Sequence, residues 1–121
     1  MSRRILIVED QEDNRQILRD LLASADLDVV EAWDGEAALT AAASQRPDLI
    51  LMDIQLPGID GYETTRRIKA NPALRHIPVI AVTSYALSGD DVKALEAGCD
   101  AYVTKPFDPA ELLAKIGGYL T

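Results

Sequence analysis

The chain has 121 residues, of which 48% are hydrophobic and 26% are charged, and its formal net charge is −8. This composition is typical of one soluble globular domain and excludes an intrinsically disordered chain. The acidic balance argues against nucleic acid or an anionic membrane as a partner, because both attract basic faces.

Short apolar runs and helical patterns alternate along the first half of the chain. ILIV at 5–8 predicts a buried strand, and DVVEA at 28–32 and LILM at 49–52 predict two more. The alanine-rich stretch 34–44 favours a helix, and a weaker helical pattern covers 61–70. The helix expected between the first two strands has these apolar residues on one face: Ile17, Leu18, Leu21, Leu22 and Ala25.

The second half continues this alternation. VIAV at 79–82 and AYVT at 101–104 predict strands, and the helical pattern at 89–97 between them is closed by Gly98. The last predicted helix has these apolar residues on one face: Leu112, Leu113, Ile116 and Leu120. Most of the strands lack the polar alternation of a half-exposed strand, so they fit a sheet that is covered on both sides.

Strands that alternate with helices predict parallel pairing through right-handed crossovers. We therefore expect an α/β fold of three layers, with a five-stranded parallel sheet and five helices. The flavodoxin-like strand order 2-1-3-4-5 and other doubly wound orders all fit the pattern alone. In each of them, ligands bind beyond the carboxyl ends of the strands.

Polar residues follow four of the predicted strands, and they are Glu9, Asp10, Asp53, Thr83 and Lys105. In the order 2-1-3-4-5 they meet at one edge of the sheet. Two carboxylates about 4 Å apart repel by roughly 4 kcal/mol at an effective dielectric constant near 20, so the site needs raised pKa values or a cation. Carboxylates, a divalent ion, a lysine and a hydroxyl together indicate phosphoryl transfer to a carboxylate nucleophile.

Several other kinds of site are excluded or disfavoured. The chain has neither a P-loop nor a GxGxxG motif, so neither of these nucleotide sites is predicted. His76 is interpreted as a turn residue and the single cysteine, Cys99, as a packing residue. A lone cysteine, the lack of a membrane span and an N-terminal apolar run too short for a signal peptide predict a cytoplasmic protein.

Four stretches carry a resemblance to a known family: ILIVEDQEDNR, PDLILMDIQLPGIDGYE, IPVIAVTS and AYVTKPF. In their order and spacing, the chain resembles the receiver domains of two-component response regulators. The resemblance implies the strand order 2-1-3-4-5. Because the sequence ends directly after the last predicted helix, we expect a single receiver domain over residues 1–121, without an output domain. A receiver domain excised from a hybrid kinase or a longer regulator is the alternative.

The resemblance also assigns roles to the residues at the strand ends. It implies that Asp53 is the phosphoacceptor, that Thr83 is the switch hydroxyl, and that Lys105 is the lysine of the site. It implies a Mg²⁺ site, with Mn²⁺ as an alternative ion. The residues expected at the ion are Asp10 and Asp53 directly, Glu9 through water and Gln55 through its backbone carbonyl. Tyr102 would be the aromatic switch residue, and the Lys105–Pro106 bond would be cis.

The implied function is a signalling switch, and not an enzyme beyond assisting its own phosphorylation and dephosphorylation. The phosphoryl group would come from a phosphohistidine of a histidine kinase or of a histidine phosphotransfer protein. The residues expected to dock that donor lie on the first helix and in the loop after the last strand, and they are Asn14, Arg15, Leu18, Pro106, Phe107 and Asp108. Tyr85 and Tyr102 would belong to a second surface, which controls a downstream protein, and the chain would be a monomer or a weak homodimer.

Two rival functions belong to other classes. A metal-dependent phosphohydrolase would also use Asp53 as a nucleophile, but such enzymes usually have a second acid two residues later, where this chain has Gln55. They also need a substrate cap, for which the chain has little room. An interaction module without phosphorylation is disfavoured by the intact set of polar residues at the strand ends.

Overall fold

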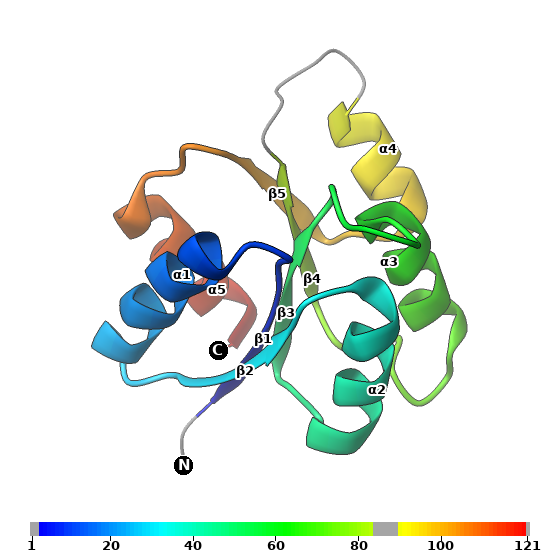
Figure 1. Ribbon diagram of the computed structural model, residues 1–121, viewed down its shortest axis with the longest axis horizontal. Coiled ribbons are helices and arrows are strands. Elements are labelled where there is room, and N and C mark those ends of the chain that lie inside the picture. Colours follow the sequence, from blue (N-terminus) through cyan, green and yellow to red (C-terminus); the bar gives the residue numbers. More distant parts are fainter. Residues whose placement is uncertain (1–2, 84–89, 121) are drawn as a thin grey trace.

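The computed structural model describes residues 3–83 and 90–120, so Tyr85 lies outside the described residues (Figure 1). Within these residues the strands are β1 (Arg4–Val8), β2 (Asp28–Ala32), β3 (Leu49–Asp53), β4 (Val79–Thr83) and β5 (Ala101–Thr104). The helices are α1 (Glu12–Ser24), α2 (Gly35–Gln45), α3 (Gly61–Ala70), α4 (Asp90–Ala97) and α5 (Pro109–Leu120). The expected alternation of strands and helices is confirmed.

The strands form one parallel sheet in the order β2-β1-β3-β4-β5, which confirms the expected flavodoxin-like order. In its register, Val8 lies beside Met52 and Thr83 lies beside Thr104. The carboxyl ends of β1, β3, β4 and β5 are therefore successive neighbours along one edge. Residues that follow these strands are brought together by the sheet itself.

Helices cover both faces of the sheet, with α1 and α5 on one side and α2, α3 and α4 on the other (Figure 1). The core on the first side includes Ile5, Ile7, Leu18, Leu22, Leu112 and Ile116. The core on the second side includes Leu6, Val8, Ala38, Ala42, Ile68 and Ala94. Successive residues of β1 enter opposite cores because side chains alternate along a strand. Each large aliphatic side chain buried in this way contributes about 1.5–3 kcal/mol.

The first predicted helix face is wrong at two positions. Ile17 is 58% exposed, and α1 ends at Ser24, so that Ala25 is an exposed C-cap residue. Leu18 and Leu22 fill the side of α1 that faces the sheet. Since adjacent residues are about 100° apart around a helix, Ile17 points away from that core.

Aspartates fix where two helices begin. The carboxylate of Asp34 accepts a hydrogen bond from the Ala37 N–H at 2.8 Å, so α2 begins at Gly35. The carboxylate of Asp60 accepts one from the Glu63 N–H at 2.8 Å, at the start of α3. Such N-caps are worth about 1 kcal/mol each.

The single histidine and the single cysteine precede strands instead of following them. His76 is an exposed turn residue ahead of β4, as expected. Cys99 is buried ahead of β5 beside Thr65, which agrees with a packing role, and burial raises the pKa of its thiol. Both therefore lie at the opposite edge of the sheet from the polar residues at the strand ends.

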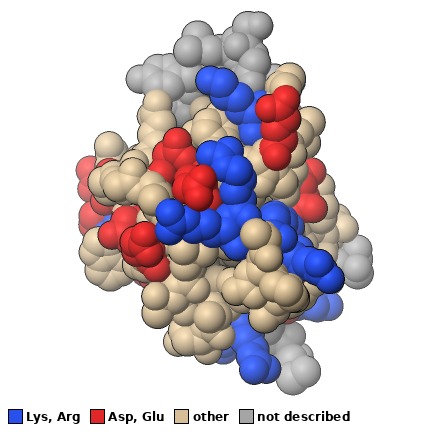
Figure 2. Space-filling model, turned by 90° about the vertical axis from the view of Figure 1, so that its right-hand side faces the viewer, with Lys and Arg blue, Asp and Glu red and all other residues tan. Residues whose placement is uncertain are grey.

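Acidic and basic side chains lie side by side on the face formed by the helices α2, α3 and α4 (Figure 2). Arg67 of α3 pairs with Glu63 at 3.0 Å and with Glu36 of α2 at 3.4 Å. Lys69 of α3 pairs with Asp100 at 3.0 Å, next to β5. These ion pairs join α3 to its neighbours. Among the helices described, none combines the length and apolar character that a membrane span requires.

Candidate functional site

The polar residues at the strand ends form one cluster. Glu9 and Asp10 follow β1, Asp53 is the last residue of β3, Thr83 is the last of β4, and Lys105 follows β5. The expectation that the sheet brings them together is confirmed for the carboxylates and the lysine by their distances. Thr83 is buried and lies at the same edge, one strand further along from Asp53.

The cluster contains an acidic triad, Glu9, Asp10 and Asp53, whose nearest carboxylate oxygens all lie within 4.8 Å of one another. Glu9 is 1% exposed and Asp53 is 5% exposed, whereas Asp10 faces solvent. A hard divalent cation prefers oxygen ligands, and Mg²⁺ is usually held by one or two carboxylates with several waters. The donor set and its partial exposure therefore fit such an ion.

Lys105 is the positive charge of the cluster. Its Nζ donates to Glu9 Oε1 at 2.7 Å and lies 4.0 Å from Asp53 Oδ2. Its backbone N–H donates to the carbonyl of Thr83 at 2.6 Å, which fixes the start of the loop after β5. The Lys105–Pro106 peptide bond is cis, as expected. In this structure, therefore, the lysine is nearer to the first acid than to the expected phosphoacceptor.

Burial and mutual repulsion separate the pKa values of the three acids. Desolvation raises the pKa of Asp53 to about 7, and the interaction with Glu9 adds to this effect. Desolvation and the same neighbour also raise the pKa of Asp10. Burial opposes ionisation of Glu9 as well, but hydrogen bonds from Lys105 and Asp53 outweigh it and lower the pKa of Glu9. A further cation is therefore expected to stabilise the ionised form of Asp53.

The loop after β3 shapes the surroundings of Asp53. The backbone N–H of Gln55 donates to Asp53 Oδ1 at 3.1 Å, while the Gln55 side chain is exposed. Gly61 begins α3 directly against this loop, and a Cβ there would lie 2.4 Å from the Asp53 carbonyl oxygen. Sequence reasoning missed this role of Gly61, because the close approach joins residues eight positions apart in a loop without a regular pattern.

The two expected switch residues lie on neighbouring strands. Thr83 is 4% exposed at the end of β4, and Tyr102 is partly buried in β5 against the core beneath α4. Their strands are paired in parallel. In the register of this pair, Tyr102 lies beside Ala81, two residues before Thr83.

A groove of about 440 Å³ lies beside the cluster, between α1 and the loop after β5. Of the residues expected to dock the phosphodonor, Asn14, Leu18, Pro106 and Phe107 line it, together with Ile17, Lys105 and Pro109. Arg15, expected on the same face, is 7% exposed, and neither it nor Asp108 is among the lining residues. Leu18 is nearly buried, whereas Ile17 is 58% exposed. Ile17, which the sequence pattern placed in the core, is therefore the larger apolar contribution of α1 to this surface.

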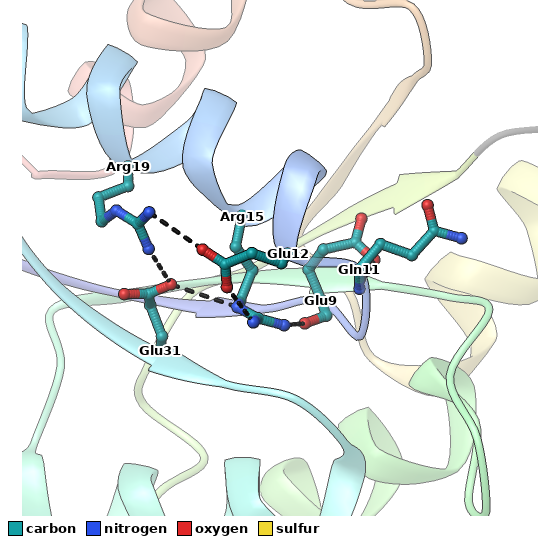
Figure 3. A network of polar contacts seen from close by, with 6 residues as sticks. All are labelled: Glu9, Gln11, Glu12, Arg15, Arg19 and Glu31. Atoms are coloured by element: carbon teal, nitrogen blue, oxygen red, sulfur yellow. Dashed lines mark hydrogen bonds and ion pairs between the residues drawn. The ribbon is translucent and has the colours of Figure 1, made fainter.

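A network of polar contacts links the segment after β1 with α1 and β2 beside the acidic triad (Figure 3). At its centre is Arg15, which is 7% exposed and donates from Nη1 to the Glu9 carbonyl at 2.9 Å. It also pairs with Glu12 and Glu31 and lies under the exposed ring of Trp33. This network was not predicted from the sequence, which placed Arg15 on the surface expected to dock the phosphodonor.

Comparison with known proteins gives consistent matches over nearly the whole chain. The sequence profile described as "response regulator receiver domain" matches residues 5–117. The polar-differentiation response regulator DivK of Brucella anthropi is 43% identical over 120 residues, which cover 99% of this chain and 98% of that protein.

Solved structures show the same similarity. A putative response regulator from Chloroflexus aurantiacus superimposes with a TM-score of 0.95 at 32% identity, covering 99% of this chain and 98% of that one. The receiver domain of a sensor histidine kinase from Pseudomonas aeruginosa, described with a magnesium ion coordinated in its active site cleft, has a TM-score of 0.92 at 40% identity. The match covers 99% of this chain and 98% of that one.

Proposed function

Because this chain belongs to the response regulator receiver domain family, we propose that it is the phosphoacceptor switch of a two-component pathway and that Asp53 accepts the phosphoryl group. One observation carries the assignment of Asp53. Its carboxylate is buried at the end of a central strand, close to two other acids and 4.0 Å from the Lys105 ammonium group. This combination supports a nucleophile in a site built for a phosphoryl group.

The proposed reaction transfers a phosphoryl group from a phosphohistidine to Asp53. An oxygen of the ionised carboxylate attacks phosphorus, a new P–O bond forms and the P–N bond breaks. The imidazole leaves with the electron pair of that bond and takes up a proton. The hydrogen bond from the Gln55 N–H to Asp53 Oδ1 leaves the other oxygen, Oδ2, as the nucleophile on the side of Lys105.

We propose that the acidic triad holds Mg²⁺, with Mn²⁺ as an alternative ion. Asp10 and Asp53 would be direct ligands, Glu9 would act through water, and Gln55 would contribute its backbone carbonyl. When bound, the ion neutralises negative charge on the phosphoryl oxygens. Desolvation is the main cause that raises the pKa values of Asp10 and Asp53, and the interaction of each with Glu9 raises them further. A bound cation would offset both effects, which supports a cation here.

Lys105 and Thr83 would stabilise the acyl phosphate. The Lys105 ammonium group, now bound to Glu9, has only a short distance to cover toward the oxygens on Asp53. The Thr83 hydroxyl would donate to another phosphoryl oxygen, and Tyr102 would turn inward as Thr83 moves. Together these changes would shift the surface of α4, β5 and α5 between two populations, and a downstream protein would bind one of them more tightly.

The groove between α1 and the loop after β5 would dock the phosphodonor, a histidine kinase or a histidine phosphotransfer protein. Ile17 and Phe107 would supply apolar contacts beside the mouth of the site. The match to nearly the whole length of DivK favours a regulator of one domain. The match to a kinase receiver supports the alternative of a domain from a longer protein.

Incubation with Mg²⁺ and phosphoramidate, which carries a P–N bond, tests this function. Intact-mass spectrometry is expected to show one added phosphate per chain, and excess EDTA is expected to prevent it. An unmodified chain under saturating donor would refute the proposal. Sustained turnover of sugar or nucleotide phosphates would instead favour the phosphohydrolase.

A further inference from the structure

Arg15 is buried in a position that the proposed phosphoryl transfer does not use. Its guanidinium group lies between the first turn of α1 and the end of β2, with only 7% of the residue exposed (Figure 3). Nη1 donates to the backbone carbonyl of Glu9 at 2.9 Å, Nη2 to the carboxylate of Glu12, and Nε lies 3.3 Å from Glu31 Oε1. One side chain thus satisfies acceptors on three elements of the chain.

The contact with Glu9 fixes the backbone that carries two acids of the triad. The Glu9 N–H donates to the Ala32 carbonyl at 3.1 Å, which extends the pairing of β1 with β2 by one residue. Arg15 holds the carbonyl of the same residue, and this carbonyl belongs to the peptide bond that leads to Asp10. The orientation of Asp10 relative to Asp53 therefore depends on a peptide group that Arg15 holds in place.

The guanidinium group is itself held in place. Glu12 and Glu31 bind it from α1 and β2, and the ring centroid of Trp33 lies 4.9 Å from its Cζ. Only a planar fork with several donors meets three acceptors in different directions while one face stacks on a ring. A lysine at this position keeps the charge but cannot make all of these contacts at once.

We propose that Arg15 is a positioning residue for the cation site, which orients Glu9 and Asp10 by clamping the peptide group between them. This inference rests on the proposed function, because it takes the acidic triad to be the Mg²⁺ site. Residues that orient metal ligands without touching the metal typically change its affinity by roughly 10–100-fold. Arg15 is thus expected to set the affinity for Mg²⁺, and not the rate once the ion is bound.

Arg19 offers a matched control one turn along the same helix. It pairs with Glu31 at 2.7 Å and with Glu12 at 3.2 Å, so it shares both acids with Arg15. No contact of Arg19 with the backbone of Glu9 or Asp10 is present among the described residues. Replacement of Arg19 therefore removes a similar charge from the same network but leaves the hydrogen bond from Arg15 to the Glu9 carbonyl in place.

The test measures Mg²⁺ binding by titration calorimetry for the wild type and for Arg15→Met, Arg15→Lys and Arg19→Met. We expect the dissociation constant to rise about tenfold in Arg15→Met, more than threefold in Arg15→Lys and less than twofold in Arg19→Met. The Mg²⁺ dependence of phosphorylation by phosphoramidate should rank the variants in the same order. The Mg²⁺ concentration for half the maximal rate should rise in the Arg15 variants, while the rate at saturating Mg²⁺ stays within twofold of the wild type.

Thermal unfolding in EDTA separates positioning from stability, since a structural role lowers the melting temperature without weakening Mg²⁺ binding of the folded protein. If Arg15→Met does not fold, Arg15→Lys alone decides. A folded Arg15 variant that binds Mg²⁺ within twofold of the wild type overturns the inference, and so does an equal loss in Arg19→Met. If the wild type binds no Mg²⁺, the proposed cation site fails first, and the inference fails with it.

Discussion

Replacement of Asp53 by asparagine is expected to stabilise the folded chain in the absence of metal. The substitution removes a carboxylate that is 5% exposed and lies close to two other acids. An asparagine of the same shape keeps an acceptor for the Gln55 N–H, which now donates to Asp53 Oδ1 at 3.1 Å. The cost of ionising a buried group disappears, while the hydrogen bond from the Gln55 N–H remains.

The pKa of Asp53 gives the magnitude. It is raised from an ordinary value of 3.8 to about 7, a difference of about three units. At about 1.4 kcal/mol per unit, the upper limit of the destabilisation is about 4 kcal/mol. Because Glu9 and Lys105 share in this titration, we expect a gain of about 2 kcal/mol in Asp53→Asn at pH 8.

The sign follows from linkage between folding and protonation. The folded pKa of Asp53 lies above the unfolded one, so the folded state binds more protons between these values. The wild type therefore loses stability as the pH rises from about 4 to about 7, and the loss is complete above that range. Asp53→Asn lacks this contribution, so its advantage should be absent near pH 4 and full at pH 8.

Urea denaturation in EDTA at several pH values measures this difference. Asp20→Asn, in the exposed middle of α1, is the control and should change the free energy of unfolding by less than about 0.5 kcal/mol. Addition of Mg²⁺ should then stabilise the wild type more than Asp53→Asn. The reasoning is refuted if Asp53→Asn is no more stable than the wild type at pH 8. It is also refuted if the stability advantage of Asp53→Asn is as large at pH 4 as at pH 8.

Three further changes act on other parts of the site. Lys105→Met removes the ammonium group that binds Glu9 at 2.7 Å, and the initial rate of phosphorylation by phosphoramidate should fall about 100-fold by intact mass. Gly61→Ala forces a Cβ to within 2.4 Å of the Asp53 carbonyl oxygen, and urea denaturation should show a loss of about 1–3 kcal/mol. Thr83→Ala should still be phosphorylated, but the NMR signals of β5 should no longer shift on phosphorylation.

Each of these changes has a control and an outcome that would contradict it. Lys115→Met on α5 should leave the phosphorylation rate within twofold, and an equal loss there would argue against a special role for Lys105. Apart from its chain neighbours and the backbone of its own helix, a Cβ added at Gly117 would meet no described atom within 4 Å, so Gly117→Ala should not destabilise the chain. If the β5 signals of Thr83→Ala shift on phosphorylation as they do in the wild type, Thr83 has no part in the switch.

The strands and the polar residues at their ends were predictable because a sheet buried on both faces leaves continuous apolar runs. The run LILM predicted β3, and the structure extends it by one residue to Asp53. The order of the strands did not follow from these runs, since several doubly wound orders bury them equally well. The resemblance to a family supplied the order, and the register then explains why Asp53 meets Glu9 and Lys105.

The contacts that the sequence did not reveal are those between distant residues with ordinary local patterns. Ile17 fitted the apolar stripe of α1, yet it lies at the margin of the stripe, beside the loop after β5. Whether a residue at the edge of the apolar stripe is buried depends on where that loop lies, and the helical period does not show this. Arg15 was similarly expected on the docking surface of α1, and only the meeting of α1 with β2 and with the segment after β1 shows why it is buried.

The central claim is that Asp53 carries the phosphoryl group, and chemical mapping tests it most directly. Borohydride reduces an aspartyl phosphate to homoserine, which peptide mass spectrometry locates in the chain. After reaction with Mg²⁺ and phosphoramidate, we predict homoserine at position 53 alone, and none when EDTA is present. Homoserine at Asp10 or at any other aspartate, or a phosphorylated chain without homoserine at position 53, would contradict the account.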